Sequence, residues 1–200
     1  MSTNIYIKQY FTSEINRREA MRYAGVSKPD AALDELLDSV IAEVGTNLLG
    51  KCVYTVIDPK LDGAQLIDRM KRSSSDFGKY AQNAELYCII VCTVGYTLDR
   101  LIARYNLISP ARALMINAYG AERAERVADA LCDEIAMQYS RDGYTAKPRF
   151  SPGYGDLSLE FQRDIFALLD PPSRIGVSLG DSLIMTPSKS ISAIVALVRE

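Results

Sequence analysis

The sequence predicts an α+β fold: a mostly antiparallel, twisted sheet with helices packed against it, one of them long. Strand-like and helical segments are interleaved along the 200 residues, at irregular spacing and without an internal repeat. Several strand-like segments with short turns follow one another near the C-terminus, which favours antiparallel or mixed pairing. The length suits one domain. We therefore expect residues 1–200 to form a single domain, with residues 1–50 as a helical N-terminal part packed on it.

Two helices are expected in this N-terminal part. The first runs from about Ser13 to Ala24 and is stopped by Gly25. The second starts at Ser27-Lys28-Pro29-Asp30, which has the form of a capping box with a proline in the first turn. It ends at Gly45, a natural C-terminal stop. Its apolar residues fall at helical spacing: Leu33, Leu36, Leu37, Val40, Ile41 and Val44.

The middle of the chain predicts two strands with a helix between them. Residues Cys52 to Ile57 are rich in β-branched and aromatic side chains and end at Asp58-Pro59, as a strand does. A helix around Ala64 to Met70 follows, and then a polar loop from Ser73 to Asp76. The run from Leu86 to Val94 is short and apolar and is bounded by a glycine, which indicates a strand buried on both faces.

Helices dominate the next part of the sequence. Leu98 to Tyr105 has helical spacing, and Ser109-Pro110 starts the longest helix, because serine caps a helix and proline fits its first turn. This helix reaches about Tyr139, with a bend expected at Gly120. A further helix spans Leu159 to Leu169. Three strand-like segments close the chain: Ile175 to Leu179, Leu183 to Met185 and Ile191 to Val198.

Charge and hydropathy exclude several classes of partner. The 23 basic and 25 acidic residues leave a net charge of -2, which gives no electrostatic reason to expect nucleic acid or an anionic membrane. The first ten residues lack the apolar core of a signal peptide. The longest apolar run is about half of what a membrane-spanning helix needs. We therefore expect a cytoplasmic protein with neither nucleic-acid nor membrane partners.

The sequence contains no histidine. This absence removes Ser-His-Asp and Cys-His catalysis, histidine-based acid–base chemistry and most zinc enzymes. It also removes any histidine ligand to a haem or to the cobalt of a cobalamin. The four cysteines stand in apolar surroundings without a C-x-x-C pair, which favours buried free thiols over metal ligands or disulfides: Cys52, Cys88, Cys92 and Cys132. We expect no metal site.

Residues Arg149 to Asp156, with the sequence RFSPGYGD, form the densest candidate site. Its glycines let the backbone approach a ligand closely, and its prolines stiffen the loop. Arg149 can hold a carboxylate through two parallel hydrogen bonds, and Tyr154 offers a flat face and a hydroxyl. These residues favour a small zwitterionic or aromatic ligand. An ordinary Gly/Pro turn is the alternative, and the near match of Gly153-Tyr154-Gly155 to a dinucleotide-binding motif is weak.

A second cluster lies on the expected long helix. Four carboxylates spaced by three or four residues form one acidic stripe beside small alanines: Glu122, Glu125, Asp129 and Asp133. Such a stripe can receive a ligand or another element, but it is more often a solvated helix face. The polar run from Met185 to Ala193 is a third distinct segment, and by itself it indicates no function.

Taken together, these segments resemble the activation domain of cobalamin-dependent methionine synthase, including its free-standing bacterial homologues. The similarity extends over nearly the whole chain, in the same order. The two most specific matches are Arg149 to Asp156, with R-x-S-P-G-Y-G-D, and Met185 to Ala193, with M-x-P-x-K-S-V-S-A. Three further segments are similar to the family's E-x-L-R-Y-x-G, T-x-G and G-S-x-x-x-E-x-x-x-D patterns: Glu19 to Gly25, Thr93 to Gly95, and Gly120 to Asp129.

The resemblance implies a curved α+β domain around an antiparallel sheet that binds S-adenosylmethionine, the methyl donor for oxidised and re-reduced cobalamin. It implies that Glu125 contacts the amino group of the ligand and that Arg149 contacts its carboxylate. The backbone around Ser151, Gly153 and Tyr154 would hold the adenine end. No catalytic residue is implied. The chain departs from the full-length enzymes in lacking their ligand-contacting N-terminal aspartate and late tyrosine.

The leading hypothesis is therefore an S-adenosylmethionine-binding module. It would support the reductive reactivation, by remethylation, of a corrinoid-dependent methionine synthase or related methyltransferase in trans. Cobalamin would enter only through that partner, because this chain has neither a histidine nor a corrinoid-binding segment. Two alternatives stay open: a ligand-free interaction module for a corrinoid protein, and a small enzyme that uses the same pocket for another metabolite.

Overall fold

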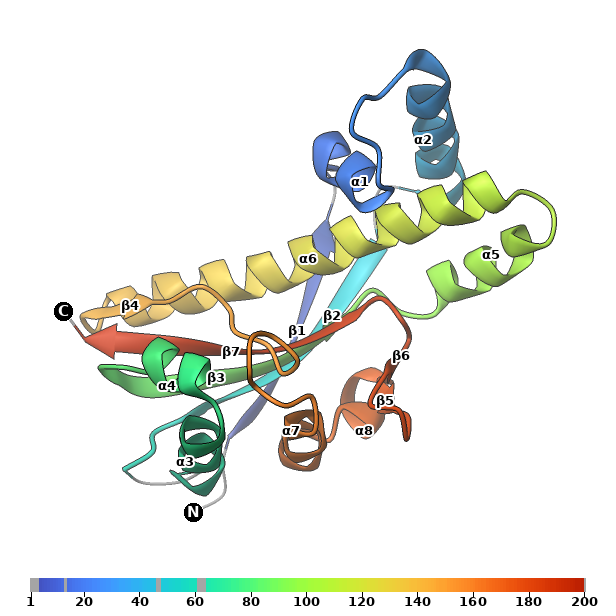
Figure 1. Ribbon diagram of the computed structural model, residues 1–200. Coiled ribbons are helices and arrows are strands. Elements are labelled where there is room, and N and C mark those ends of the chain that lie inside the picture. Colours follow the sequence, from blue (N-terminus) through green and yellow to red (C-terminus); the bar gives the residue numbers. More distant parts are fainter. Residues whose placement is uncertain (1–3, 13, 46–47, 61–63, 200) are drawn as a thin grey trace.

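The computed structural model describes residues 4–12, 14–45, 48–60 and 64–199, and it has the α+β fold expected from the sequence. Five antiparallel strands form a sheet in the order β1-β2-β3-β7-β4. The long helix α6 (Pro110–Ser140) lies along one face of this sheet, as Figure 1 shows. The strands are β1 (Ile5–Thr12), β2 (Leu48–Ile57), β3 (Ala84–Thr93), β4 (Tyr144–Ala146) and β7 (Ser190–Arg199).

The central strands separate two apolar cores. Side chains alternate between the faces of a strand, so Cys88 and Ile90 of β3 point toward α6 whereas Ile89 and Val91 point the other way. The first core also receives α1 (Arg17–Tyr23), α2 (Ala31–Val44) and α5 (Thr97–Asn106). The second is covered by the remaining helices (Figure 1): α3 (Ala64–Ser73), α4 (Ser75–Tyr80), α7 (Phe161–Leu169) and α8 (Pro171–Ile175). Burial on both faces explains why β3 is continuously apolar.

The N-terminal part differs from the helical expectation, because a strand precedes its two helices. Strand β1 pairs with β2 at the edge of the sheet. Its polar side chains bond to α6: Lys8 Nζ lies 2.6 Å from Glu134 Oε1, and the Tyr10 hydroxyl donates to Glu134 Oε2 at 2.6 Å. Because polar side chains of this edge strand contact α6, its sequence lacks the alternation of apolar and polar residues by which a buried strand is recognised. The expected first residue of α1, Ser13, lies outside the described residues, and Asn16 caps the helix.

Other helices and strands also begin or end at residues that differ from those expected from the sequence. The cap of α2 is Asp30, whose carboxylate accepts from the Leu33 N–H at 2.9 Å, and not Ser27. The expected loop at residues 73–76 is mostly helical, since Ser74 caps α4 directly after α3 ends. In the tail, Ile175 ends α8, and a separate two-stranded sheet consists of β5 (Ser178–Leu179) and β6 (Met185–Thr186).

The expected long helix begins, as predicted, with Pro110 in its first turn, although the Ser109 side chain makes no capping hydrogen bond. Gly120, where we expect a bend, is buried within α6 at a close approach. A Cβ atom there would lie 2.6 Å from Leu98 Cδ1 and 3.0 Å from Lys189 Cγ. Gly120 thus lets α5 and the segment before β7 pack tightly on α6. No helix in the described part of the chain is long and apolar enough to cross a bilayer.

Candidate functional site

The loop between β4 and α7 is anchored along β7. The Lys147 N–H donates to the Ala196 carbonyl at 2.8 Å, and Phe150 exchanges two backbone hydrogen bonds with Ile194, at 2.9 and 2.8 Å. Between these attachments the chain carries Arg149 toward α6. The Phe150 ring is buried against Phe77 and Tyr80 of α4. The sheet and α4 therefore hold the base of the loop in place.

The tip of the loop is held by its own turns and by α4. Gly153 and Gly155 have φ angles of +88° and +54°, which favour glycine, and the Gly153 N–H donates to the Leu157 carbonyl at 2.8 Å. The Asp156 carboxylate accepts from the backbone N–H groups of Ser75 and Asp76, at 2.8 and 3.1 Å, and from the Ser74 hydroxyl. These donors lower the pKa of Asp156, and its charge suits the N-terminus of a helix. The sequence did not reveal this role, because α4 is about eighty residues away.

Arg149 and Glu125, which the resemblance assigns to the two ends of the ligand's amino-acid group, form an ion pair. Arg149 Nη2 lies 2.7 Å from Glu125 Oε2 and 2.9 Å from Asp129 Oδ1, and these two carboxylates occupy successive turns of α6. The guanidinium is mostly buried, with 20% of the side chain exposed. Its Nη1 atom is buried and has no hydrogen-bond partner among the described residues. Burial alone would lower the pKa of Arg149, but the neighbouring Cys132, Asp129 and Glu125 raise it overall.

Two adjoining pockets flank this ion-pair cluster. The first, called the Arg149 pocket below, has a volume of about 350 Å³ and is lined by residues that include Asp129, Cys132, Asp133, Lys147, Arg149 and Val195. The second, the Glu125 pocket, has a volume of about 200 Å³, and its lining includes Asn16, Glu19, Tyr23, Glu125 and Asp129. Asp129 lines both pockets, whereas Arg149 and Glu125 each line one. Asp129 therefore stands at the boundary between them.

The other three predicted site residues lie outside the lining of these pockets. Ser151, Gly153 and Tyr154 follow Arg149 on the same loop, but they line neither the Arg149 pocket nor the Glu125 pocket. Tyr154 is 68% exposed, and its ring lies nearly perpendicular to that of Phe150, with 5.4 Å between the ring centroids. Much of the Tyr154 side chain is thus accessible from solvent.

The four carboxylates of the acidic stripe on α6 have different partners. Glu122 is buried and forms an ion pair of 2.5 Å with the fully buried Arg123. It also accepts from the Asn16 N–H at 3.0 Å, which attaches the start of α1 to α6. Glu122 is thus structural, whereas Glu125 and Asp129 bind Arg149 and Asp133 lines the Arg149 pocket.

The cysteines are free thiols, and three of them are buried. Cys132 is partly buried and lines the Arg149 pocket; burial raises its pKa to about 11, although Arg149 opposes the shift. A thiol with so high a pKa is neutral near pH 7 and is a weak nucleophile. No group of three or more potential ligands among the described residues is arranged to hold a metal ion.

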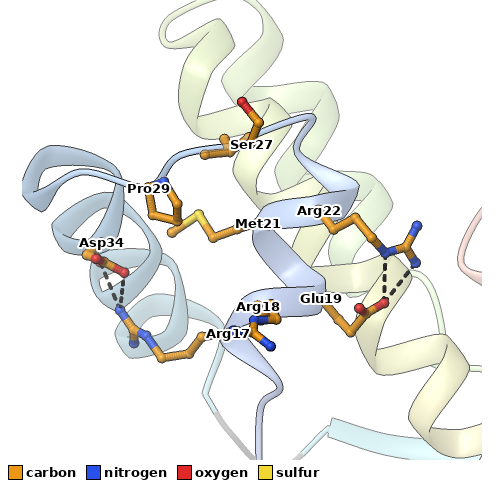
Figure 2. Close-up of a pocket in the computed structure, with 9 residues that line it drawn as sticks. Arg17, Arg18, Glu19, Met21, Arg22, Ser27, Pro29 and Asp34 are labelled. Atoms are coloured by element: carbon orange, nitrogen blue, oxygen red, sulfur yellow. Dashed lines mark hydrogen bonds and ion pairs between the residues drawn. The ribbon is translucent and has the colours of Figure 1, made fainter.

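A larger pocket of about 670 Å³ lies between α1 and α2 and is shown in Figure 2. Two of its arginines are already paired, Arg17 with Asp34 and Arg22 with Glu19. A further pocket of about 310 Å³ near α8 is lined by residues that include Lys51, Tyr96 and Arg100. Neither contains any of the predicted site residues.

The fold is similar to that of the MetH reactivation domain, whose crystal structure holds bound S-adenosylhomocysteine (AdoHcy). The similarity covers 97% of this chain and 78% of that one, with 14% sequence identity and a TM-score of 0.67. No protein-family model and no curated protein matches the chain by sequence. In this chain, Arg149, Glu125 and Asp129 meet where the β4–α7 loop contacts α6. The chain thus has the fold of the MetH reactivation domain.

Proposed function

We propose that this chain binds S-adenosylmethionine and supports the reductive reactivation of a corrinoid-dependent methionine synthase, or a related methyltransferase, in trans. The observation that carries the proposal is the Arg149 cluster. A mostly buried guanidinium beside two carboxylates opens on a pocket, in a fold similar to one that holds AdoHcy.

The cluster suits the amino-acid end of such a ligand. A buried polar nitrogen without a partner is costly, and a ligand carboxylate would satisfy Arg149 Nη1. A guanidinium binds a carboxylate through two parallel hydrogen bonds, so Arg149 is the residue proposed to hold it. The acidic pair Glu125 and Asp129 supplies acceptors for the ammonium group. A pocket of about 350 Å³ lies within the range typical of small-ligand sites.

The adenosyl end would lie along the loop. The backbone there is accessible, because Gly153 is exposed and Ser151 is partly exposed. The largely exposed ring of Tyr154 is suited to stacking on a flat base. These three residues therefore remain the proposed contacts of the adenine.

The corrinoid would come with the partner protein, in the cytoplasm. This chain contains no histidine to ligate a cobalt. The sulfonium and the corrinoid would supply the methyl-transfer chemistry, whereas this chain would bind and orient the donor and exclude water from it. In this role the chain is one component of a methyltransferase system.

Calorimetric titration with S-adenosylmethionine and AdoHcy tests the proposal. We expect both to bind and to raise the melting temperature of the protein. If neither ligand gives heat or a thermal shift at millimolar concentration, the binding proposal is wrong. In that case a ligand-free interaction module for a corrinoid protein becomes the better explanation of the fold.

A further inference from the structure

Strand β1 offers a free edge and exposed apolar side chains beside it. It pairs with β2 on one side, and no strand in the described part of the chain pairs with its other side (Figure 1). A free strand edge presents unpaired N–H and C=O groups, which are a template for another strand. We propose that this edge is the interface of a symmetric homodimer, in which β1 pairs antiparallel with β1 of a second copy.

The side chains of β1 divide between the two faces of the sheet. Lys8 bonds to Glu134 of α6, which places it on the α6 face. Ile7 lies opposite Val53, a residue of the second core, so Ile7 and Phe11 lie on the other face. Ile7 is 48% exposed and Phe11 is 71% exposed. The helices of the second core thus leave two apolar side chains uncovered at the free edge, where a neighbouring strand would cover them.

Twofold symmetry restricts the register of two β1 strands. The symmetry axis of a continuous antiparallel sheet is perpendicular to it, so side chains of the same face lie opposite each other. Two such registers, centred on Lys8 and on Gln9, leave a single residue of the strand Ile5–Thr12 without a cross-strand neighbour. The Lys8 register places two ammonium groups directly opposite each other, which is destabilising. The Gln9 register avoids this and places Ile7 of each copy opposite the partner's Phe11.

The contacts of this register favour a second copy as the occupant of the edge. Ile7 and Phe11 of both copies form one apolar cluster of four side chains on the face opposite α6. On the α6 face, Lys8 lies opposite the partner's Tyr10, so no like charges meet. The Lys8 and Glu134 side chains are 41% and 40% exposed, so the edge is also open on this face. The strand is therefore complementary to itself in backbone pairing, apolar surface and charge.

The proposed interface is separate from the Arg149 cluster. The loop that carries Arg149 is anchored on β7, and β2 and β3 lie between β7 and β1. The Arg149 pocket is lined by residues of other segments, so dimerisation leaves it open and does not depend on the proposed function. An interface made by one strand edge is small. We therefore expect a dimer that exchanges with monomer.

Sedimentation equilibrium with a register-specific pair of variants tests the proposal. Wild type should dimerise between about 1 and 500 μM, as a small interface allows. Ile7→Lys and Phe11→Glu each replace one member of the apolar pair with a charge, and the change occurs twice in a symmetric dimer. Each should raise the dissociation constant about 10-fold or more. Leu107→Lys is the matched control at an apolar position that is 90% exposed and lies outside β1, and it should leave the constant unchanged.

Mixing the two variants tests the register itself. In an equimolar mixture of Ile7→Lys and Phe11→Glu, the introduced lysine lies opposite the introduced glutamate, and the native Phe11 lies opposite the native Ile7. The mixture should therefore dimerise more tightly than either variant alone. Because the new ion pair is exposed, added salt should weaken this mixed dimer.

Four outcomes would overturn the proposal. Wild type could remain monomeric over the whole range, or Ile7→Lys and Phe11→Glu could dimerise as tightly as wild type. Leu107→Lys could weaken the dimer as much as they do, or their mixture could remain monomeric. Circular dichroism and melting curves confirm that the variants fold. Titration of each variant with S-adenosylmethionine should give the wild-type result, because the interface and the Arg149 pocket are separate.

Discussion

Arg149 is the residue whose chemistry the sequence best predicted and whose surroundings it only partly predicted. An arginine at the base of a Gly/Pro loop indicated carboxylate binding, and the resemblance indicated Glu125, 24 residues earlier in the chain, as a companion. Asp129 was visible as part of an acidic stripe and as the last residue of the segment that resembles the family's G-S-x-x-x-E-x-x-x-D pattern. Its ion pair with Arg149 and its position between two pockets depend on how the β4–α7 loop meets α6, whereas helical spacing predicts only the face of α6 on which it lies.

Replacing Arg149 should affect ligand affinity more than folding. Arg149→Ala removes a charged bidentate hydrogen bond and leaves Glu125 and Asp129 without their cation, so we expect a loss of about 2–4 kcal/mol in the free energy of S-adenosylmethionine binding. Arg149→Lys should restore little of it, because a point charge cannot reproduce the planar fork. Calorimetry measures the affinity and urea unfolding the stability. Full affinity in Arg149→Lys would show that a charge alone suffices.

At the scale of elements, the strands that the sequence predicted best are those buried on both faces. The run from Leu86 to Val94 could be recognised because every position of β3 from Tyr87 on is apolar or buried. Strand β1 escaped prediction because its polar side chains bond to Glu134 of α6. The contact of Asp156 with the N-terminus of α4 was not predicted either, since a contact between segments distant in the sequence leaves no local pattern.

The hydrogen bonds from the N-terminus of α4 to the Asp156 carboxylate should make the stability of the protein depend on pH. The pKa of Asp156 is lowered in the folded state, first by the Ser74 hydroxyl, so its stabilisation is present above the unfolded-state pKa of about 3.9 and is lost as the pH falls through the folded-state pKa. Asp156→Asn should therefore be less stable than wild type at neutral pH, and the difference should shrink below about pH 4. Urea unfolding across this range measures it. A difference that stayed constant into strong acid would contradict a charge-based cap.

Gly50 shows how closely β2 approaches α6. A Cβ atom at Gly50 would lie 2.2 Å from Val127 Cγ2, and Val127 is fully buried. A β-branched side chain has little freedom to move aside, so Gly50→Ala should destabilise the fold by about 2–3 kcal/mol.

Two further variants test whether this contact is the cause. Adding Val127→Ala to Gly50→Ala removes the clashing methyl groups and should recover part of the lost free energy of unfolding. Gly78→Ala in α4 is the matched control, because its Cβ would meet only the Lys71 carbonyl oxygen at 3.6 Å. It should be neutral or slightly stabilising. Urea unfolding measures all three, and a double variant no more stable than Gly50→Ala would rule out the Val127 contact.

At the scale of the whole molecule, α6 contacts the sheet, the N-terminal helices and the loop that carries Arg149. It packs on the sheet, carries Glu125 and Asp129, and receives α1 and α2 from the N-terminal part. The Ser109-Pro110 start predicted the long helix, and the length of the chain predicted a single domain. They could not predict how the N-terminal helices attach, because that attachment combines apolar packing with polar contacts between segments distant in the sequence.

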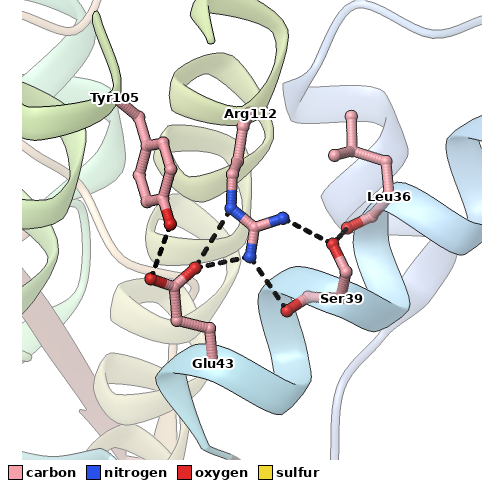
Figure 3. A network of polar contacts seen from close by, with 5 residues as sticks. All are labelled: Leu36, Ser39, Glu43, Tyr105 and Arg112. Carbon is pink, nitrogen blue, oxygen red and sulfur yellow. Dashed lines mark hydrogen bonds and ion pairs between the residues drawn. The ribbon is translucent and has the colours of Figure 1, made fainter. Parts of the chain in front are cut away.

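One such contact is the network around Arg112, shown in Figure 3. Arg112 of α6 donates to Glu43 Oε2 of α2 at 3.0 Å and to the Ser39 hydroxyl at 2.6 Å, and the Tyr105 hydroxyl of α5 donates to Glu43 Oε1 at 2.8 Å. Arg112 lowers the pKa of Glu43, as a stabilising pair does. The Arg112 and Glu43 side chains are only 18% and 26% exposed, so water screens the pair less than it screens a surface salt bridge.

Removing this network should loosen α2 without loosening the sheet. Arg112→Ala deletes the contacts from α6 to both Glu43 and Ser39, and we expect it to lower the local stability of α2 by about 1–2 kcal/mol. Because stability differs between regions of a structure, the amide hydrogens of α2 should exchange about 5- to 30-fold faster while those of β3 and β7 keep their rates. Arg163→Ala is the matched control: it breaks an exposed pair with Glu160 on α7, side chains 55% and 65% exposed, and should change exchange little. Faster exchange in β3 and β7 together with α2 would mean instead that the N-terminal part and the sheet unfold as one cooperative unit, and that α2 cannot open alone.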